Sequence, residues 1–120
     1  GYFTVMGVSV EKAAAGLEAA GADVVGSNCG TGVDDMVSIA RAMARATRLP
    51  LIIQPNAGLP RSLDGQLVYD ETPDAMAARV PELLDLGVAI VGGCCGPTPA
   101  HVRAIRRAVE RPTRAQRGSI

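Results

Sequence analysis

Short apolar runs alternate with helical periodicities along this chain. Three runs have the composition of buried strands, and each follows a turn signal: Asp23–Ser27, Leu51–Gln54 and Val88–Gly92. The segments around them have apolar residues at helical spacing. The pattern therefore predicts the order helix, strand, helix, strand, helix, strand, helix. Repeated strand–helix units without a hairpin between strands favour a parallel sheet with right-handed crossovers.

Four helices are expected around these strands. The first two cover about Val10–Ala20 and Asp34–Thr47. The other two begin at Thr72-Pro73 and Thr98-Pro99, where a capping side chain is followed by proline at the first helical position. The second helix has an apolar face at helical spacing, which we interpret as core packing. Its members are Met36, Val37, Ala40, Met43 and Ala44.

Polar and glycine residues follow each predicted strand at corresponding places. Asn28-Cys29-Gly30 follows the first strand, Pro55-Asn56-Ala57-Gly58 the second, and Cys94-Cys95-Gly96 the third. The carboxyl ends of parallel strands meet at the same edge of a sheet, and ligand sites of parallel α/β folds lie there. We therefore expect all three segments at one rim, and the site with them.

The three cysteines, Cys29, Cys94 and Cys95, are candidates for a shared metal site. Adjacent residues in a strand point to opposite faces, so Cys94 and Cys95 can converge only beyond the strand end. Three thiolates around zinc would leave the fourth tetrahedral position open for a substrate. Core cysteines and a Cys94–Cys95 disulfide are the alternatives. A secreted disulfide framework is disfavoured, because three cysteines cannot all pair within one chain and nothing resembles a signal peptide.

Composition narrows the classes of function. The formal net charge of the 120 residues is zero, and Tyr2, Phe3 and Tyr69 are the only aromatic residues. Neither the basic surface nor the stacking platform of a nucleic-acid-binding protein is present, so we expect no nucleic-acid partner. No apolar run is long enough to cross a bilayer, so we expect no membrane partner. We expect a cytoplasmic protein, where thiols stay reduced and can bind metal.

Four segments resemble the zinc-dependent homocysteine S-methyltransferases, particularly the homocysteine-binding barrel of cobalamin-dependent methionine synthase. They occur in the family's order and extend from about Met6 to Val109. An Asn-Cys pair combined with a distant Gly-Gly-Cys-Cys-Gly is the specific part of this resemblance. The matching segments are Met6–Val8, Gly21–Gly30, Gln54–Gly58 and Gly92–Pro99.

The resemblance implies an α/β fold that is the C-terminal half of a (β/α)8 TIM barrel, with the three strands as its sixth, seventh and eighth. A full barrel needs about 250 residues. Residues 1–110 would form this partial homocysteine-binding barrel, and residues 111–120 a polar, basic tail or linker. The partial barrel would need a partner, either the missing N-terminal half-barrel or a second copy.

Carried over to this chain, the resemblance makes Cys29, Cys94 and Cys95 the zinc ligands. It places Asn28 and Asn56 where they could hold the amino-acid end of homocysteine. For either asparagine, a turn residue that bonds its own backbone is an equally good explanation.

The implied function is zinc-dependent methyl transfer to the thiol of homocysteine, which produces methionine. The methyl donor is not readable from these residues, and a cobalamin bound elsewhere is one candidate. A non-enzymatic zinc-binding or assembly module derived from a truncated barrel is the alternative function. A thiol redox protein is disfavoured, because the sequence contains no Cys-x-x-Cys pair.

Two further features are open to interpretation. The segment Asn56–Glu71 is long for a strand-to-helix connection and contains a turn signal at Asp64-Gly65, so it is either a lid over the rim or a surface insertion. His101, the only histidine, lies on the first turn of the last expected helix. We interpret it as a surface residue or as a residue that supports the metal ligands without binding the metal itself, because a helix N-terminus disfavours its charged form.

Overall fold

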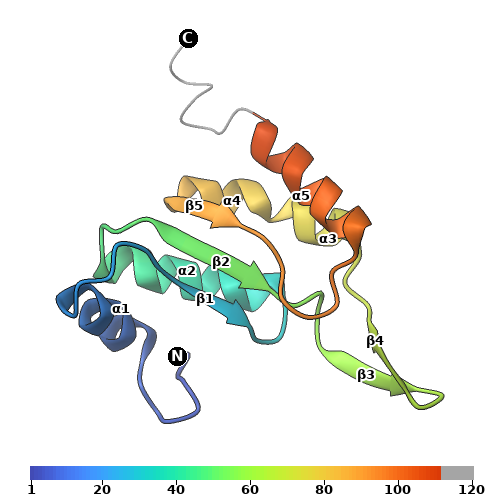
Figure 1. Ribbon diagram of the computed structural model, residues 1–120, viewed down its shortest axis with the longest axis horizontal. Helices are drawn as coiled ribbons and strands as arrows, with labels where there is room; N and C mark the ends of the chain where they lie inside the picture. Colours follow the sequence, from blue (N-terminus) through green and yellow to red (C-terminus); the bar gives the residue numbers. More distant parts are fainter. Residues whose placement is uncertain (112–120) are drawn as a thin grey trace.

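A computed structural model describes residues 1–111 and confirms three parallel strands. The strands form one sheet in the order β1-β2-β5 (Figure 1). The expected tail lies outside the described residues, apart from Arg111. The sheet strands are β1 (Val25–Cys29), β2 (Leu51–Pro55) and β5 (Val88–Val91). The helices are α1 (Val10–Ala19), α2 (Val33–Ala46), α3 (Pro73–Ala78), α4 (Val80–Asp85) and α5 (Pro99–Glu110).

The first strand begins two residues later than the sequence predicts. Val24 is exposed, and pairing with β2 starts at Val25, which lies opposite Leu51. Strand boundaries follow the partner strand as well as the local apolar run. Asn28 and Cys29 are therefore the last residues of β1, opposite Gln54 and Pro55, and not residues of the following loop.

The third expected helix is two short helices. α3 ends at Ala78, Arg79 adopts a turn, and α4 begins at Val80. Pro81 explains the break, because proline has no N–H to donate to the preceding turn and its ring crowds the carbonyl four residues earlier.

The segment after β2 contains a hairpin, so the expectation of strands without an intervening hairpin is wrong here. β3 (Pro60–Leu63) pairs antiparallel with β4 (Gln66–Tyr69). The predicted turn at Asp64-Gly65 is confirmed, and both residues have positive φ, 51° and 79°, as a two-residue hairpin loop of this kind requires. The hairpin extends away from the sheet (Figure 1).

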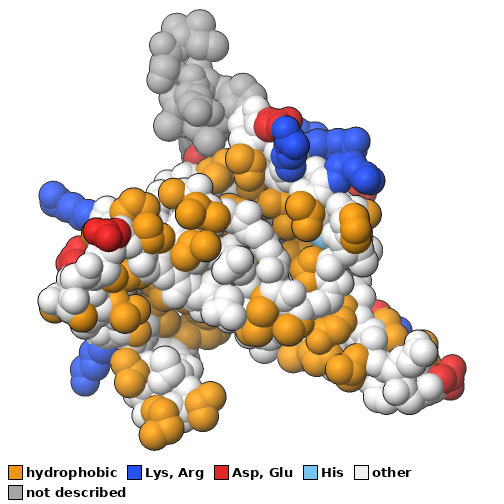
Figure 2. Space-filling view, viewed as in Figure 1, with side chains coloured by type: hydrophobic (Ala, Val, Ile, Leu, Met, Phe, Trp, Pro, Cys, Tyr) orange, Lys and Arg blue, Asp and Glu red, His pale blue; other side chains and the backbone are white. Residues whose placement is uncertain are grey.

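One face of the sheet is buried beneath helices. Val25, Leu51, Ile53 and Val88 form a core with apolar residues of α1, α2 and α4, including the two methionines of α2. Side chains alternate along a strand, so Ile52 and its β5 partner Ile90 point to the opposite face. That face is turned toward the viewer in Figure 1, and Figure 2 shows hydrophobic side chains exposed across this view of the molecule. Within residues 1–111, no helix has the length and apolar character of a membrane span.

Glu71 joins the base of the hairpin to α2. Gly32, at the start of α2, has no side chain to cap the helix, and the Glu71 carboxylate accepts from the Val33 N–H at 3.3 Å instead. The Glu71 backbone N–H donates to the Ala57 carbonyl at 3.1 Å. Burial is the main cause that raises the pKa of the Glu71 carboxyl, and Asp34 adds to it.

The raised pKa of Glu71 predicts a pH-dependent stability. The contribution of Glu71 is fully present below the ordinary carboxyl pKa of about 4.3 and is lost as pH rises through the folded-state pKa. Glu71→Gln keeps an acceptor oxygen but does not titrate. The free energy of unfolding of this variant, relative to wild type, should therefore increase from about pH 4 to about pH 7, as measured by urea unfolding at several pH values.

Asp70→Asn provides a control of opposite sign. The hydrogen bond from Arg61 lowers the pKa of Asp70, so the contribution of Asp70 is present above its ordinary pKa and is lost as pH falls. Relative to wild type, Asp70→Asn should lose stability as pH rises. Parallel pH curves for wild type and Glu71→Gln would contradict the account of Glu71.

Candidate metal centre

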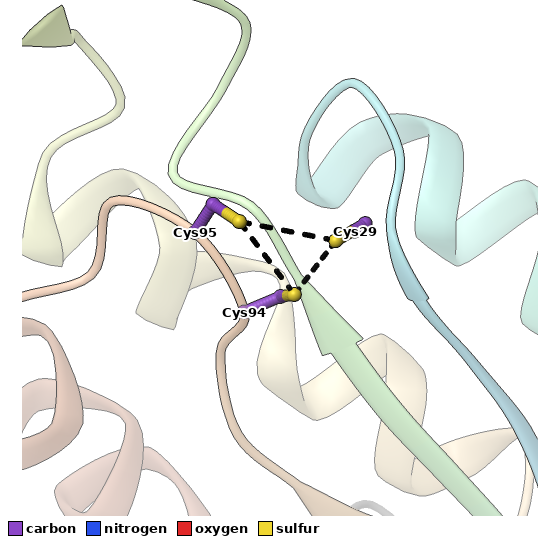
Figure 3. Close-up of side chains that lie close together, drawn as sticks. All are labelled: Cys29, Cys94 and Cys95. Carbon is purple, nitrogen blue, oxygen red and sulfur yellow. Dashed lines mark hydrogen bonds between the residues drawn. The ribbon is translucent and has the colours of Figure 1, made fainter. Parts of the chain in front are cut away.

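The three cysteine side chains converge at the carboxyl edge of the sheet (Figure 3). The Sγ atoms of Cys29 and Cys94 are 2.7 Å apart, those of Cys29 and Cys95 3.9 Å, and those of Cys94 and Cys95 3.8 Å. Two of the three cysteines are exposed and Cys29 is half-buried. All three are free thiols, so neither a core position nor a disulfide describes them.

The backbone at each end of the cluster explains the convergence. Cys94 and Cys95 lie beyond the end of β5, as expected, so strand alternation does not separate their side chains. Gly96 follows with φ 96°, a conformation that favours glycine. Cys29 ends β1 with φ 64°, which is unusual for a residue other than glycine. Such left-handed residues are concentrated at functional sites.

The cluster fits a tetrahedral metal that prefers sulfur. With zinc–sulfur bonds of about 2.3 Å, two sulfur ligands of a tetrahedral zinc lie about 3.8 Å apart. Two of the three observed separations match this value, and the Cys29–Cys94 separation would have to widen by about 1 Å. Three thiolates suit zinc better than a hard cation, which prefers oxygen ligands.

The pKa values of Cys29 and Cys94 are shifted in opposite directions. The hydrogen bond with Cys94 is the largest cause that raises the pKa of Cys29 to about 11. Hydrogen bonds from Cys29 and then from Asn28 lower the pKa of Cys94. Without metal, Cys94 therefore ionises before Cys29, and metal binding near neutral pH would displace the Cys29 proton.

Both asparagines singled out from the sequence lie at this cluster. The Asn28 amide Nδ2 donates to Cys94 Sγ at 3.7 Å, a long contact to a sulfur acceptor. Asn56 is 7% exposed, and its side chain bonds to the backbone of Gly30 and Cys95, residues distant in sequence. A role for either asparagine in binding homocysteine stays a prediction.

His101 is buried rather than at the surface, which corrects one of the two interpretations of this residue. It is 7% exposed; its Nδ1 accepts from the Thr98 N–H at 3.0 Å, and its Nε2 lies 2.7 Å from the Glu71 carbonyl oxygen. The imidazole thus completes the cap of α5 and ties that helix to the base of the hairpin. Nothing local in the sequence indicates the Glu71 contact, because 30 residues separate the partners.

Known proteins are similar to this chain over most of its length. A sequence model of the homocysteine S-methyltransferase family matches residues 2–109. Methionine synthases of Mycobacterium tuberculosis and Mycobacterium leprae are each 37% identical to the chain, over 94% and 89% of its length. The matched region is only 10% and 9% of those enzymes.

Solved structures show the same fold. The apo and metallated forms of the homocysteine methyltransferase MmuM from Escherichia coli superpose with TM-scores of 0.64 and 0.65, at 24% identity. They cover 86% and 84% of this chain, which matches 34% and 30% of theirs. The family match extends from the N-terminal segment to α5 and includes all three cysteines, and with 37% identity to two methionine synthases it establishes that the chain belongs to the homocysteine S-methyltransferase family.

Proposed function

We propose that this chain is the zinc- and homocysteine-binding part of an enzyme that transfers a methyl group to the thiol of homocysteine and so produces methionine. The observation that carries the proposal is the convergence of Cys29, Cys94 and Cys95 from two distant segments at one edge of a parallel sheet. The chain spans about a tenth of the length of the methionine synthases that it matches. The methyl donor and the residues that bind it belong to parts outside this chain.

The cysteines would supply three ligands and leave a fourth position for the substrate. The homocysteine thiol would bind at that position, where zinc held by the three cysteines would lower its pKa; the thiol proton would leave to solvent and the sulfur would be a nucleophile near neutral pH. Cys94 and Cys95 are exposed and Cys29 is half-buried, so the cluster is accessible to a substrate. In the transfer, a sulfur–carbon bond forms, the bond between the methyl group and its donor breaks, and the donor keeps that electron pair.

The partial sheet supports the proposal that residues 1–110 are the C-terminal half of a (β/α)8 barrel. In a barrel, the strands at both edges of this sheet would pair with further strands, and the open face would line the interior. Ile90 on β5 is 50% exposed on this side, a position that a complete barrel would bury. The missing N-terminal half-barrel, or a second copy of the chain, would provide this cover.

The family also supports narrower proposals. Homocysteine and a methyl donor are the proposed partners, in keeping with the matched family. Methylcobalamin carried elsewhere in the enzyme is one candidate donor, because the Gln54–Gly58 and Gly92–Pro99 segments resemble the cobalamin-dependent branch. We place the protein in the cytoplasm, where the thiols would stay reduced. Residues 111–120 would be a polar, basic tail or a linker.

Zinc coordination tests the proposed function directly. The chain is expected to bind one zinc with three sulfur ligands, rising to four when homocysteine is added, because the substrate thiol occupies the open position. Metal analysis gives the stoichiometry, and X-ray absorption at the zinc edge gives the number of sulfur ligands. A site with three sulfurs that does not respond to homocysteine would favour the alternative, a zinc-binding or assembly module. A chain that binds no zinc would contradict both.

A further inference from the structure

Asn56 is a buried polar residue that the proposed chemistry does not use. Its side chain is enclosed between the two segments that carry the cysteines and is 7% exposed. The amide Nδ2 donates to the Gly30 carbonyl at 2.9 Å, and the amide Oδ1 accepts from the Cys95 N–H at 2.9 Å. One short side chain thus joins the residue after Cys29 to Cys95 itself.

The backbone around Asn56 makes matching bonds to the same two segments. The Asn56 N–H donates to the Cys29 carbonyl at 3.2 Å. The Pro55 carbonyl accepts from the Cys94 N–H at 2.9 Å, and the Ala57 N–H donates to the Cys95 carbonyl at 3.0 Å. The end of β2 therefore holds the backbone of every cysteine, although it contributes no thiol.

The chemistry of an asparagine side chain suits this position. A carboxamide presents a donor and an acceptor at the same time, and both are satisfied here. An aspartate could accept from the Cys95 N–H but could not donate to the Gly30 carbonyl, and an apolar side chain would leave both backbone groups without these partners. Because this position is buried, water cannot readily replace the hydrogen bonds that Asn56 makes to these backbone groups.

We propose that Asn56 is a positioning residue that holds the Cys29 segment and the Cys94–Cys95 segment at the spacing of a shared metal. This inference rests on the proposed zinc site and assigns Asn56 a role other than contact with homocysteine. Groups that orient metal ligands through hydrogen bonds commonly change metal affinity by about 10- to 100-fold when they are removed. The two side-chain hydrogen bonds of Asn56 hold the backbone segments that carry the cysteines, so Asn56 belongs to this class of orienting groups.

Thr47 offers a matched control at the opposite end of the sheet. It is also 7% exposed, and its hydroxyl donates to Glu18 at 2.8 Å and accepts from the Leu49 N–H at 3.1 Å. Thr47→Ala therefore removes a buried group with two hydrogen bonds without touching the cysteine segments. Loss of stability alone would affect Thr47→Ala and Asn56→Ala alike.

The test compares wild type, Asn56→Ala, Asn56→Asp and Thr47→Ala in the full chain. Zinc affinity is measured by chelator competition, and ligand geometry is measured by the absorption spectrum of the cobalt-substituted protein. The hydrogen bond from the Cys95 N–H to Asn56 is monitored by amide hydrogen exchange at Cys95 without metal. We expect Asn56→Ala to weaken zinc binding by about 10- to 100-fold, alter the cobalt spectrum and accelerate exchange at Cys95. Asn56→Asp, which keeps the acceptor oxygen, should retain more protection at Cys95, and Thr47→Ala should resemble wild type in all three measurements.

Three results would overturn the inference. One is an Asn56→Ala variant with wild-type zinc affinity and cobalt spectrum. Another is unchanged exchange at Cys95, which can be read even if wild type binds no zinc and the proposed function fails. The last is a variant that binds zinc normally but no longer responds to homocysteine, because that result would make Asn56 a substrate contact.

Discussion

Replacing Cys94 or Cys95 by alanine is expected to weaken zinc binding by about two to three orders of magnitude. A structural zinc site contributes about 10–16 kcal/mol in total, so one of four ligands accounts for about 2.5–4 kcal/mol, or about 70- to 900-fold in affinity. Both side chains are exposed, so their truncation leaves no cavity in the core and the variants should fold like wild type. Zinc per chain after dialysis, together with chelator competition, measures the effect.

Ser27→Ala is the control for the cysteine variants. Ser27 lies on β1, two residues before Cys29. Its substitution removes a hydroxyl group, which is similar in size to a thiol, and leaves all three cysteines in place. It should bind zinc as wild type does. Full zinc occupancy in both cysteine variants would refute the assignment of Cys94 and Cys95 as ligands.

Gly26→Ala is expected to cause the largest loss of stability among single substitutions that add one methyl group. A Cβ at Gly26 would lie 1.8 Å from the Ile52 carbonyl oxygen and 2.5 Å from Ile52 Cγ2. The clash is with backbone, so no rotamer change relieves it and β1 has to move away from β2. We expect a cost of about 3 kcal/mol or more in the free energy of unfolding, at the upper end of overpacking effects. Urea unfolding followed by circular dichroism measures it.

Gly16→Ala is the matched control and should have the opposite sign. Gly16 lies inside α1, and nothing is within 4 Å of the position its Cβ would occupy. Alanine there is expected to stabilise the helix by about 0.5–1 kcal/mol. Gly26→Ala should also weaken zinc binding, because Cys29 lies three residues further along the displaced strand. An unfolding midpoint for Gly26→Ala equal to that of wild type would contradict this account of the β1–β2 contact.

The order of the helices and the three parallel strands follows from local patterns, and the structure confirms it except for the β3–β4 hairpin and the division of the third helix into α3 and α4. Apolar runs, helical spacing and cap residues depend on neighbours a few positions away, which the sequence displays directly. Placing Cys29, Asn56, Cys94 and Cys95 at one rim required only the rule that parallel strands end at the same edge. The two methionines of α2 are buried, as their spacing predicts.

Tertiary contacts decided the remaining features. The start of β1 depends on where β2 pairs with it. The bonds of Asn56 reach residues 26 and 39 positions away, and His101 meets a carbonyl 30 positions away. Sequence neighbours carry no signal for such pairs, because each partner is an ordinary backbone group. The residue types that could hold a metal were therefore readable along the chain, whereas the contacts of Asn56 and His101 with distant backbone groups emerged only once the chain was folded.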